Sequence, residues 1–211
     1  MSSSTNVSSG RTSLDLAIEH PFPPRQQEIL DELERTFIRH GLNVTVGELA
    51  KAARCSRRTL YELATSKEEL FLLVFDRRMR RLQKASRQAA ARETEPVARM
   101  REFLATAVVT FEPLSDAFIA AVKDLPQADW LWRFHVNQVR DLIIEIIEGG
   151  VERRLFRPVH ASLMADVVIS STFRVIDPDV LKANGISSAE ALHELYTFFG
   201  AGLEERSASD A

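Results

Sequence analysis

Apolar residues recur every three or four positions from Pro24 almost to the carboxyl end of the chain, the spacing that gathers them on one face of an α-helix. The segment PRQQEILDELERTFIRHG, residues 24–41, is typical: it begins at a proline and ends at Gly41, a residue common just beyond a helix. We find no apolar alternation with a period of two and no internal repeat in the sequence. The hydrophobic pattern therefore predicts an all-α protein.

Three helix starts are predicted close together after this first helix. Thr45 with Glu48, and Ser66 with Glu69, have the spacing of capping boxes, in which each side chain binds the other residue's backbone N–H. Ser56 is a third N-cap residue. The helices that these caps open are expected at about 46–53, 57–63 and 67–91.

The remainder of the chain predicts longer helices separated by proline and glycine. Their expected ranges are about 96–112, 115–125, 128–153, 160–176 and 188–205. Breaks are expected at Pro113, Pro126, Gly149-Gly150 with Pro158, and DPDVLKANGIS. Residues 1–23 are rich in serine and close with HPFPP, so we expect a flexible arm. A small helical domain at 24–92 and a larger one at 93–211 would follow it.

Composition is that of a globular protein: 211 residues, 45% hydrophobic, with a formal net charge of −3. The single cysteine, Cys55, excludes an internal disulfide and a multi-thiolate zinc site. The amino-terminal residues lack the apolar run of a secretory signal, and no uninterrupted 18-residue apolar segment occurs. We expect a cytoplasmic protein with no membrane segment, no metal and no cofactor.

Charge is distributed unevenly along the chain. Residues 25–92 hold 15 Lys and Arg against 9 Asp and Glu, a net charge of about +6, whereas residues 93–211 hold 11 against 19, about −8. A basic module joined to an acidic one indicates that the basic part meets a polyanion.

The two short helices have the features of a helix-turn-helix. Ala50 is small enough for a steep helix crossing, and Leu60 can fill that crossing from the second helix. The first turn of the second helix then presents its polar side chains to the major groove of duplex DNA, where arginine can bind guanine through two hydrogen bonds. These candidate DNA-binding residues are Arg57, Arg58, Thr59 and Tyr61, with Lys67 placed near phosphate at the start of the next helix.

Each of these residues has a plainer interpretation. Arg57 and Arg58 could simply cover a solvated helix face, and Tyr61 could be a half-buried core residue. In DRRMRR, residues 76–81, four arginines within five positions span too much of a helix circumference to face one groove. We expect this run to lie mainly on the solvent side, with direct DNA contact as the alternative.

The segment TVGELAKAARCSRRTLYELATSKEELF resembles the DNA-binding domain of the tetracycline-repressor (TetR) family of bacterial transcription regulators, over about residues 25–80. TLY followed by SKEEL is its most specific element. The resemblance implies that Thr45, Tyr61 and Lys67 contact phosphates while Arg57, Arg58 and Thr59 face bases.

The sequence departs from the family pattern in its turn and in its second helix. Arg54 stands where the family usually has glycine, which costs roughly 1 kcal/mol if the backbone there is left-handed. Gly47 replaces a longer side chain and cannot read a base, and Leu63-Ala64 replaces an aromatic pair.

The acidic part carries more aromatic residues than the small domain, which favours a cavity between its helices as well as a core. The polar residues among them are candidates for binding a small, largely apolar effector. The predicted effector-binding residues are Phe111, Trp130, Phe134, His135, Gln138, Thr172, Phe173 and Arg174.

The last two predicted helices carry small residues and an unusually apolar surface, as in FFGAGLEE. By the family resemblance they would pair with a second copy, giving a homodimer that binds a pseudo-palindromic operator as a repressor. The alternatives are an all-helical protein-interaction module or an enzyme. No zinc helix, phosphate-binding loop or nucleophile elbow is present in the sequence, so we expect no catalytic residues.

Overall fold

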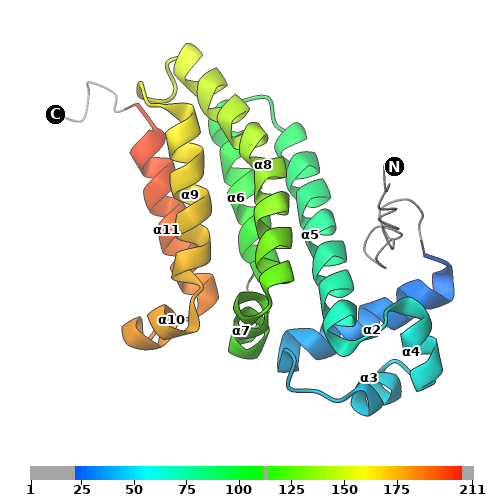
Figure 1. The fold of residues 1–211 in the computed structure, drawn as a ribbon. Coiled ribbons are helices and arrows are strands. Elements are labelled where there is room, and N and C mark those ends of the chain that lie inside the picture. Colours follow the sequence, from blue (N-terminus) through cyan, green and yellow to red (C-terminus); the bar gives the residue numbers. More distant parts are fainter. Residues whose placement is uncertain (1–21, 112–113, 206–211) are drawn as a thin grey trace, which may run out of the picture.

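The computed structural model describes residues 22–111 and 114–205, which form ten helices and no named strand (Figure 1). The predicted all-α fold is confirmed. Residues 1–21 of the expected arm and the predicted break at Pro113 lie outside the described residues. The helices are α2 (Pro24–His40), α3 (Val46–Ala52), α4 (Arg57–Leu63), α5 (Lys67–Ala91), α6 (Pro96–Phe111), α7 (Asp116–Asp124), α8 (Pro126–Glu152), α9 (Ala161–Val175), α10 (Pro178–Asn184) and α11 (Ser188–Leu203).

Two groups of helices share the long helix α5. Figure 1 shows α2, α3 and α4 gathered at the amino-terminal end of α5, while α6, α8, α9 and α11 run beside one another along the rest of the molecule. The short helices α7 and α10 lie at the end of this bundle nearest the small group. The helix-turn-helix thus stands at one end of a helical bundle, and α5 connects the two parts.

The predicted caps are present at the short helices. The Thr45 hydroxyl accepts from Glu48 N–H and the Glu48 carboxylate accepts from Thr45 N–H, which completes the box at α3. The Ser56 hydroxyl caps α4 in the predicted way, through Thr59 N–H. At α5 the Ser66 half of the box forms, but the Glu69 carboxylate also reaches one residue further back, to the N–H and hydroxyl of Thr65.

The helix predicted at 128–153 is present as α8, which ends at Glu152. Gly149 and Gly150 lie inside this helix, and the chain turns just after it, at Arg154, which has a φ of 56°. Gly150 instead leaves room for Phe156: a Cβ built at Gly150 would lie 2.0 Å from the Phe156 ring. The predicted break DPDVLKANGIS contains the helix α10, which Asp177 caps and which ends at the left-handed Gly185.

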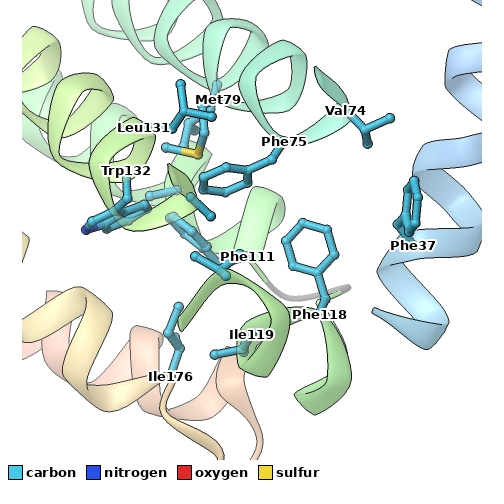
Figure 2. Packing of buried hydrophobic residues seen from close by; sticks show 14 of the residues in the cluster. Phe37, Val74, Phe75, Met79, Phe111, Phe118, Ile119, Leu131, Trp132 and Ile176 are labelled. Atoms are coloured by element: carbon cyan, nitrogen blue, oxygen red, sulfur yellow. The ribbon is translucent and has the colours of Figure 1, made fainter. Parts of the chain in front are cut away.

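The helix-turn-helix is fastened to the bundle through α7. Ser115 N–H donates to the carbonyl of Ile38 near the end of α2, and Gly41 lies so close to α7 that a Cβ there would be 2.1 Å from the Ala117 carbonyl oxygen. Phe118 of α7 packs on Phe71 of α5 at 5.1 Å between ring centroids. In Figure 2 the Phe118 side chain lies between Phe37 and the residues deeper in the bundle.

The arginine run of α5 lies on the solvent side only in part: the Arg80 and Arg81 side chains are 38% and 48% exposed, but the other two arginines are not solvated as the sequence predicted. Arg77 and Arg78 are mostly buried and pair with acidic residues of α2, Arg77 with Asp31 at 2.7 Å and Arg78 with Glu34 at 2.8 Å. Arg81 pairs with the same Glu34. The run therefore attaches α5 to α2, because the acidic side chains of α2 face it.

In the two described ranges, no single helix is both long enough and apolar enough to cross a bilayer. Among these helices, only α6 and α7 taken together reach the length and composition of a span, and their axes differ by 97°.

Candidate nucleic-acid interface and internal cavity

The residues predicted to pack between α3 and α4 are buried. Ala50 and Leu60 are both buried, and Leu49, Ala53 and Leu63 complete a small apolar core beneath the two helices. With the apolar side of α4 buried, its opposite side presents Arg57, Arg58 and Tyr61, all of them exposed. Tyr61 is 51% exposed, so it is a surface residue rather than a core tyrosine.

The two arginines of α4 lie differently. Arg57 leans over α3, where a Cβ at Gly47 would lie only 2.7 Å from its guanidinium nitrogen Nη2. Gly47 thus gives Arg57 a place that any other residue would fill. Arg58 extends into solvent, with 90% of its side chain exposed and a 3.3 Å ion pair to Glu62 one turn away. Its guanidinium is the more accessible of the two.

The side chains expected near phosphate are already hydrogen-bonded. The Thr45 hydroxyl donates to the Glu48 carboxylate at 2.7 Å, and hydrogen bonds from Thr45 hold the pKa of Glu48 below its ordinary value. The Lys67 ammonium donates to the Leu42 carbonyl at 2.7 Å. Lys67 retains two further N–H donors, whereas Thr45 would have to release Glu48 to donate to another acceptor.

The turn between α3 and α4 is left-handed at Arg54, with a φ of 48°. The Arg54 carbonyl accepts a hydrogen bond from Arg25 at 3.0 Å, which ties the start of α2 to this turn. The conformation that the family reserves for glycine is therefore retained with an arginine, at the expected cost of roughly 1 kcal/mol.

A cavity of about 60 Å³, partly open to solvent, lies in the bundle between α5, α6, α8, α9 and α11. Most of its surface is apolar and aromatic, and none of the described residues that line it is Asp, Glu, Lys or Arg. Small-molecule pockets more often measure roughly 300–1,000 Å³. A ligand larger than a few water-sized groups must therefore move these helices apart. The polar residues lining the cavity are Gln83, Ser86, His135, Thr172 and Tyr196.

His135 forms the polar wall of the cavity with both ring nitrogens occupied. Nε2 lies 2.8 Å from the Asp76 carboxylate, which can only accept, so Nε2 carries the proton of a neutral ring. Nδ1 then accepts from Gln83 Nε2 at 2.8 Å, and the same Gln83 amide donates to the His135 carbonyl. This second bond requires nitrogen at that position of Gln83 and so fixes the orientation of its amide.

Asp76 lies behind His135 and is almost completely buried. Burial raises the pKa of its carboxyl, but the hydrogen bonds from His135 and Arg80 outweigh that effect, so the pKa stays below its ordinary value. Arg80 donates to the second carboxylate oxygen at 2.7 Å. The charge of Asp76 is therefore balanced within α5 and α8.

Thr172 and Tyr196 close the cavity from α9 and α11. Thr172 donates to the Val168 carbonyl at 2.7 Å, so the Tyr196 hydroxyl, 3.0 Å away, donates to Thr172. Burial raises the pKa of Tyr196 to about 12, which keeps this hydroxyl protonated.

The structure separates the predicted effector-binding residues into two sets. Phe111, His135 and Thr172 line the cavity. Phe173 stands behind it, stacked on the cavity residue Trp132 at 4.4 Å. The other four lie outside, because they fall on the outer faces of α8 and α9: Trp130, Phe134, Gln138 and Arg174.

Sequence reasoning missed the cavity residues of α5. Gln83 and Ser86 follow the arginine run on a helix whose polar residues were expected to face solvent. Their spacing of three residues, in register with the apolar Met79 and Leu82, was the available signal.

Two further kinds of site, a metal centre and a reactive thiol, are not supported by the described residues. No group of three or more His, Cys, Asp or Glu there could hold a metal ion. Partial burial raises the pKa of the Cys55 thiol, which disfavours the reactive thiolate.

A helix-turn-helix with exposed arginines, joined by one long helix to a helical bundle, is the arrangement of a DNA-binding transcriptional regulator. Residues 29–74 match the model of a family described as bacterial regulatory proteins, tetR family. This match shows that residues 29–74 are similar to the DNA-binding domain of this family of regulators.

Similar proteins extend the likeness over most of the chain. The HTH-type transcriptional regulator YvaF of Bacillus subtilis is 21% identical over 187 residues, which cover 88% of this chain and 98% of YvaF. The TetR family transcriptional regulator PfmR from Thermus thermophilus is 25% identical with a TM-score of 0.58, covering 84% of this chain and 99% of PfmR.

A third similar structure is that of AibR in complex with isovaleryl coenzyme A and operator DNA. It has a TM-score of 0.60 and 16% identity, covering 82% of this chain and 97% of AibR. At this identity the likeness shows a common fold.

Proposed function

We propose that this regulator is a homodimeric repressor that binds a pseudo-palindromic DNA operator in the cytoplasm and is released when a small, largely apolar effector enters the bundle cavity. One observation carries the proposal: α5 begins at the helix-turn-helix and also forms one wall of the cavity.

For DNA, the proposal assigns base contacts to Arg57, Arg58 and Thr59 and phosphate contacts to Thr45, Tyr61 and Lys67. The exposure of the α4 arginines supports the first set, since a base-reading side chain must be accessible. The position of Lys67 in the first turn of α5 supports the second, because free N–H groups at a helix start attract phosphate.

For the dimer, the proposal assigns the interface to α9 and α11. Leu163 and Val167 on α9 and Phe198 on α11 are exposed apolar residues, and Phe198 is 81% exposed. Apolar residues gathered on neighbouring helices typically mark a protein interface. A twofold partner seated there would set two α4 helices about one turn of DNA apart.

For the effector, support comes from the size and position of the cavity. A cavity of about 60 Å³ must expand to admit most small molecules, and expansion moves α5 against α8. The effector acts as an inducer if the expanded state has the lower affinity for DNA, since a ligand shifts a population only through its different affinities for two states.

Selection of bound duplexes from a random DNA pool, followed by affinity against salt concentration, tests the DNA part of the proposal. We expect an inverted repeat. Arg58→Ala should relax base preference at one position of each half-site by about 1–3 kcal/mol. Lys67→Ala should weaken binding to all sequences and reduce the salt slope by about one unit.

Arg133→Ala is the matched control for Arg58→Ala, because Arg133 is also exposed and also pairs with an acidic residue one turn away, but lies on α8. It should bind DNA as the wild type does. Failure to enrich any sequence, with affinity remaining near 10⁻⁴ to about 10⁻⁶ M at physiological salt, would exclude a sequence-specific regulator.

A further inference from the structure

The polar groups that line the cavity differ in whether they have a partner. His135, Thr172 and Tyr196 satisfy one another or neighbouring groups, as described above. Ser86 is 1% exposed and lines the cavity, yet its hydroxyl makes no hydrogen bond to any residue of the two described ranges. Every fully buried side-chain nitrogen or oxygen of the described residues has a partner, so a Ser86 hydroxyl without one is open to the pocket, where a ligand can reach it.

Gln83 supplies a second free group one turn before Ser86. Its amide nitrogen is occupied by His135 Nδ1 and the His135 carbonyl, which leaves the oxygen Oε1 as an acceptor without a donor among the described residues. Residues three apart on a helix are neighbours on one face. Gln83 and Ser86 therefore offer one acceptor and one hydroxyl side by side on the α5 wall.

Among the described residues, the cavity offers no charged side chain to pair with an anionic or a cationic ligand. Its described lining contains no Asp, Glu, Lys or Arg, and the nearest carboxylate, Asp76, is already paired with His135 and Arg80. Burying an unpaired ionised group costs far more than a hydrogen bond returns. Charged groups such as carboxylate, phosphate or quaternary ammonium are thus disfavoured against this lining.

We propose that the effector is an uncharged, mainly apolar molecule carrying a hydroxyl or amide group, which donates to Gln83 Oε1 and accepts from the Ser86 hydroxyl. This inference rests on the proposed function, because it takes the cavity to be the effector site. It adds the chemical class of the ligand and the two residues that recognise its polar group.

Four probes, each with a single benzene ring, distinguish a neutral polar ligand from an apolar, an anionic and a cationic one. They are benzyl alcohol, toluene, benzoate and benzylammonium. Isothermal titration calorimetry of the full chain at pH 7, without DNA, gives the dissociation constant of each. Benzyl alcohol should bind at least about tenfold more tightly than benzoate or benzylammonium. Equal or tighter binding of either ion would overturn the proposal, as would failure of all four probes to bind.

Ser86→Ala tests the recognition of the polar group. It should raise the dissociation constant of benzyl alcohol by about three- to tenfold. The dissociation constant of toluene should change by less than about twofold, because toluene has no group for Ser86 to bind. Ser170→Ala, an exposed serine of α9, is the control and should change neither constant. Equal weakening of benzyl alcohol and toluene by Ser86→Ala would mean that Ser86 acts on the packing of the cavity alone, contrary to the proposal.

The effect of benzyl alcohol on the affinity for the selected operator DNA is measured in a separate experiment. The regulator proposal and the proposed ligand class can then be rejected independently. Binding of benzyl alcohol through Ser86 without any change in DNA affinity would keep the ligand class and reject the effector role. If the protein binds no specific DNA but still binds benzyl alcohol more tightly than the two ions, the regulator proposal is rejected and the ligand class assigned to the cavity is retained.

Discussion

At the scale of single residues, Gly47 decides where Arg57 lies. The α4 helix would present Arg57 outward, but the missing side chain at Gly47 lets the guanidinium rest on α3. Gly47 therefore positions Arg57, the residue to which we assign a base contact. Glycine at this place costs helix stability, since it loses more backbone freedom than alanine on folding.

Gly47→Ala should raise the free energy of unfolding by about 0.5–1 kcal/mol and change the base preference read by Arg57. The new Cβ would meet only the end of a flexible side chain, which can move away at little cost. Thermal unfolding and DNA selection measure the two effects. Gly149→Ala, where a Cβ meets nothing within 4 Å, should raise stability without altering base preference.

At the scale of elements, the end of α2 determines how the helix-turn-helix sits on the bundle. Gly41 combines a φ of 53° with direct approach to the Ala117 carbonyl of α7. On the other side of α2, Asp31 and Glu34 hold the arginines of α5. Two different kinds of contact therefore fasten one helix to both α5 and α7.

Gly41→Ala should lower the free energy of unfolding by more than the roughly 1 kcal/mol expected from backbone strain alone, because its Cβ would overlap a backbone carbonyl that cannot move aside. Gly185→Ala separates the two causes. Gly185 also has a positive φ, of 66°, but open space around it, so only the strain should remain. Chemical denaturation of both variants gives the comparison, and equal losses would show that the α7 contact is unimportant.

Glu34→Ala should destabilise the protein by about 3–5 kcal/mol, because it leaves the largely buried Arg78 without a counter-ion. The exposed pair of Glu32 with Arg35 on the same helix supplies the control. Glu32→Ala should cost less than about 1 kcal/mol. Urea unfolding of the two variants measures the difference, and a small loss for Glu34→Ala would contradict the role assigned to this pair.

At the scale of the whole molecule, α5 provides the connection between the cavity and the DNA-binding part, through two separate polar contacts. His135 lines the cavity and binds Asp76 on α5. One residue further along α5, Arg77 binds Asp31 of α2. Under the proposed function, a ligand that displaces His135 would act on the helix that also holds α2.

Lowering the pH should reduce the stability of the wild type more than that of an Asp76→Asn variant, because only the wild type can lose the charge of Asp76. The ordinary pKa of Asp76 is about 3.8 and the folded-state pKa is lower, so the unfolded chain binds more protons between the two values. The contribution of the charged carboxylate is complete above about pH 5 and is lost as the pH falls through the folded pKa.

Thermal unfolding midpoints from pH 7 to pH 3 test this linkage. The wild type should lose stability more steeply below pH 4 than Asp76→Asn, which lacks the titrating group but is less stable at pH 7. The other carboxylates titrate in both proteins and cancel in the comparison. Parallel curves would mean that Asp76 does not contribute to acid sensitivity.

The sequence by itself determined the helices and their caps. Thr45, Ser56 and Ser66 were identifiable because a helix start needs an acceptor for backbone N–H groups within three residues, a purely local requirement. The apolar face of α4, and hence the exposure of Arg58, also followed from spacing along one helix.

Only the tertiary structure decided what faces those helices. The arginines of α5 appeared to be solvated until α2 brought Asp31 and Glu34 against them, from more than 40 positions earlier in the chain. The cavity likewise needs residues of five helices, so spacing along one helix could not show that Ser86 lines it or that Trp130 lies outside it. Periodicity states which residues share a face, but the partner of that face depends on how distant segments pack.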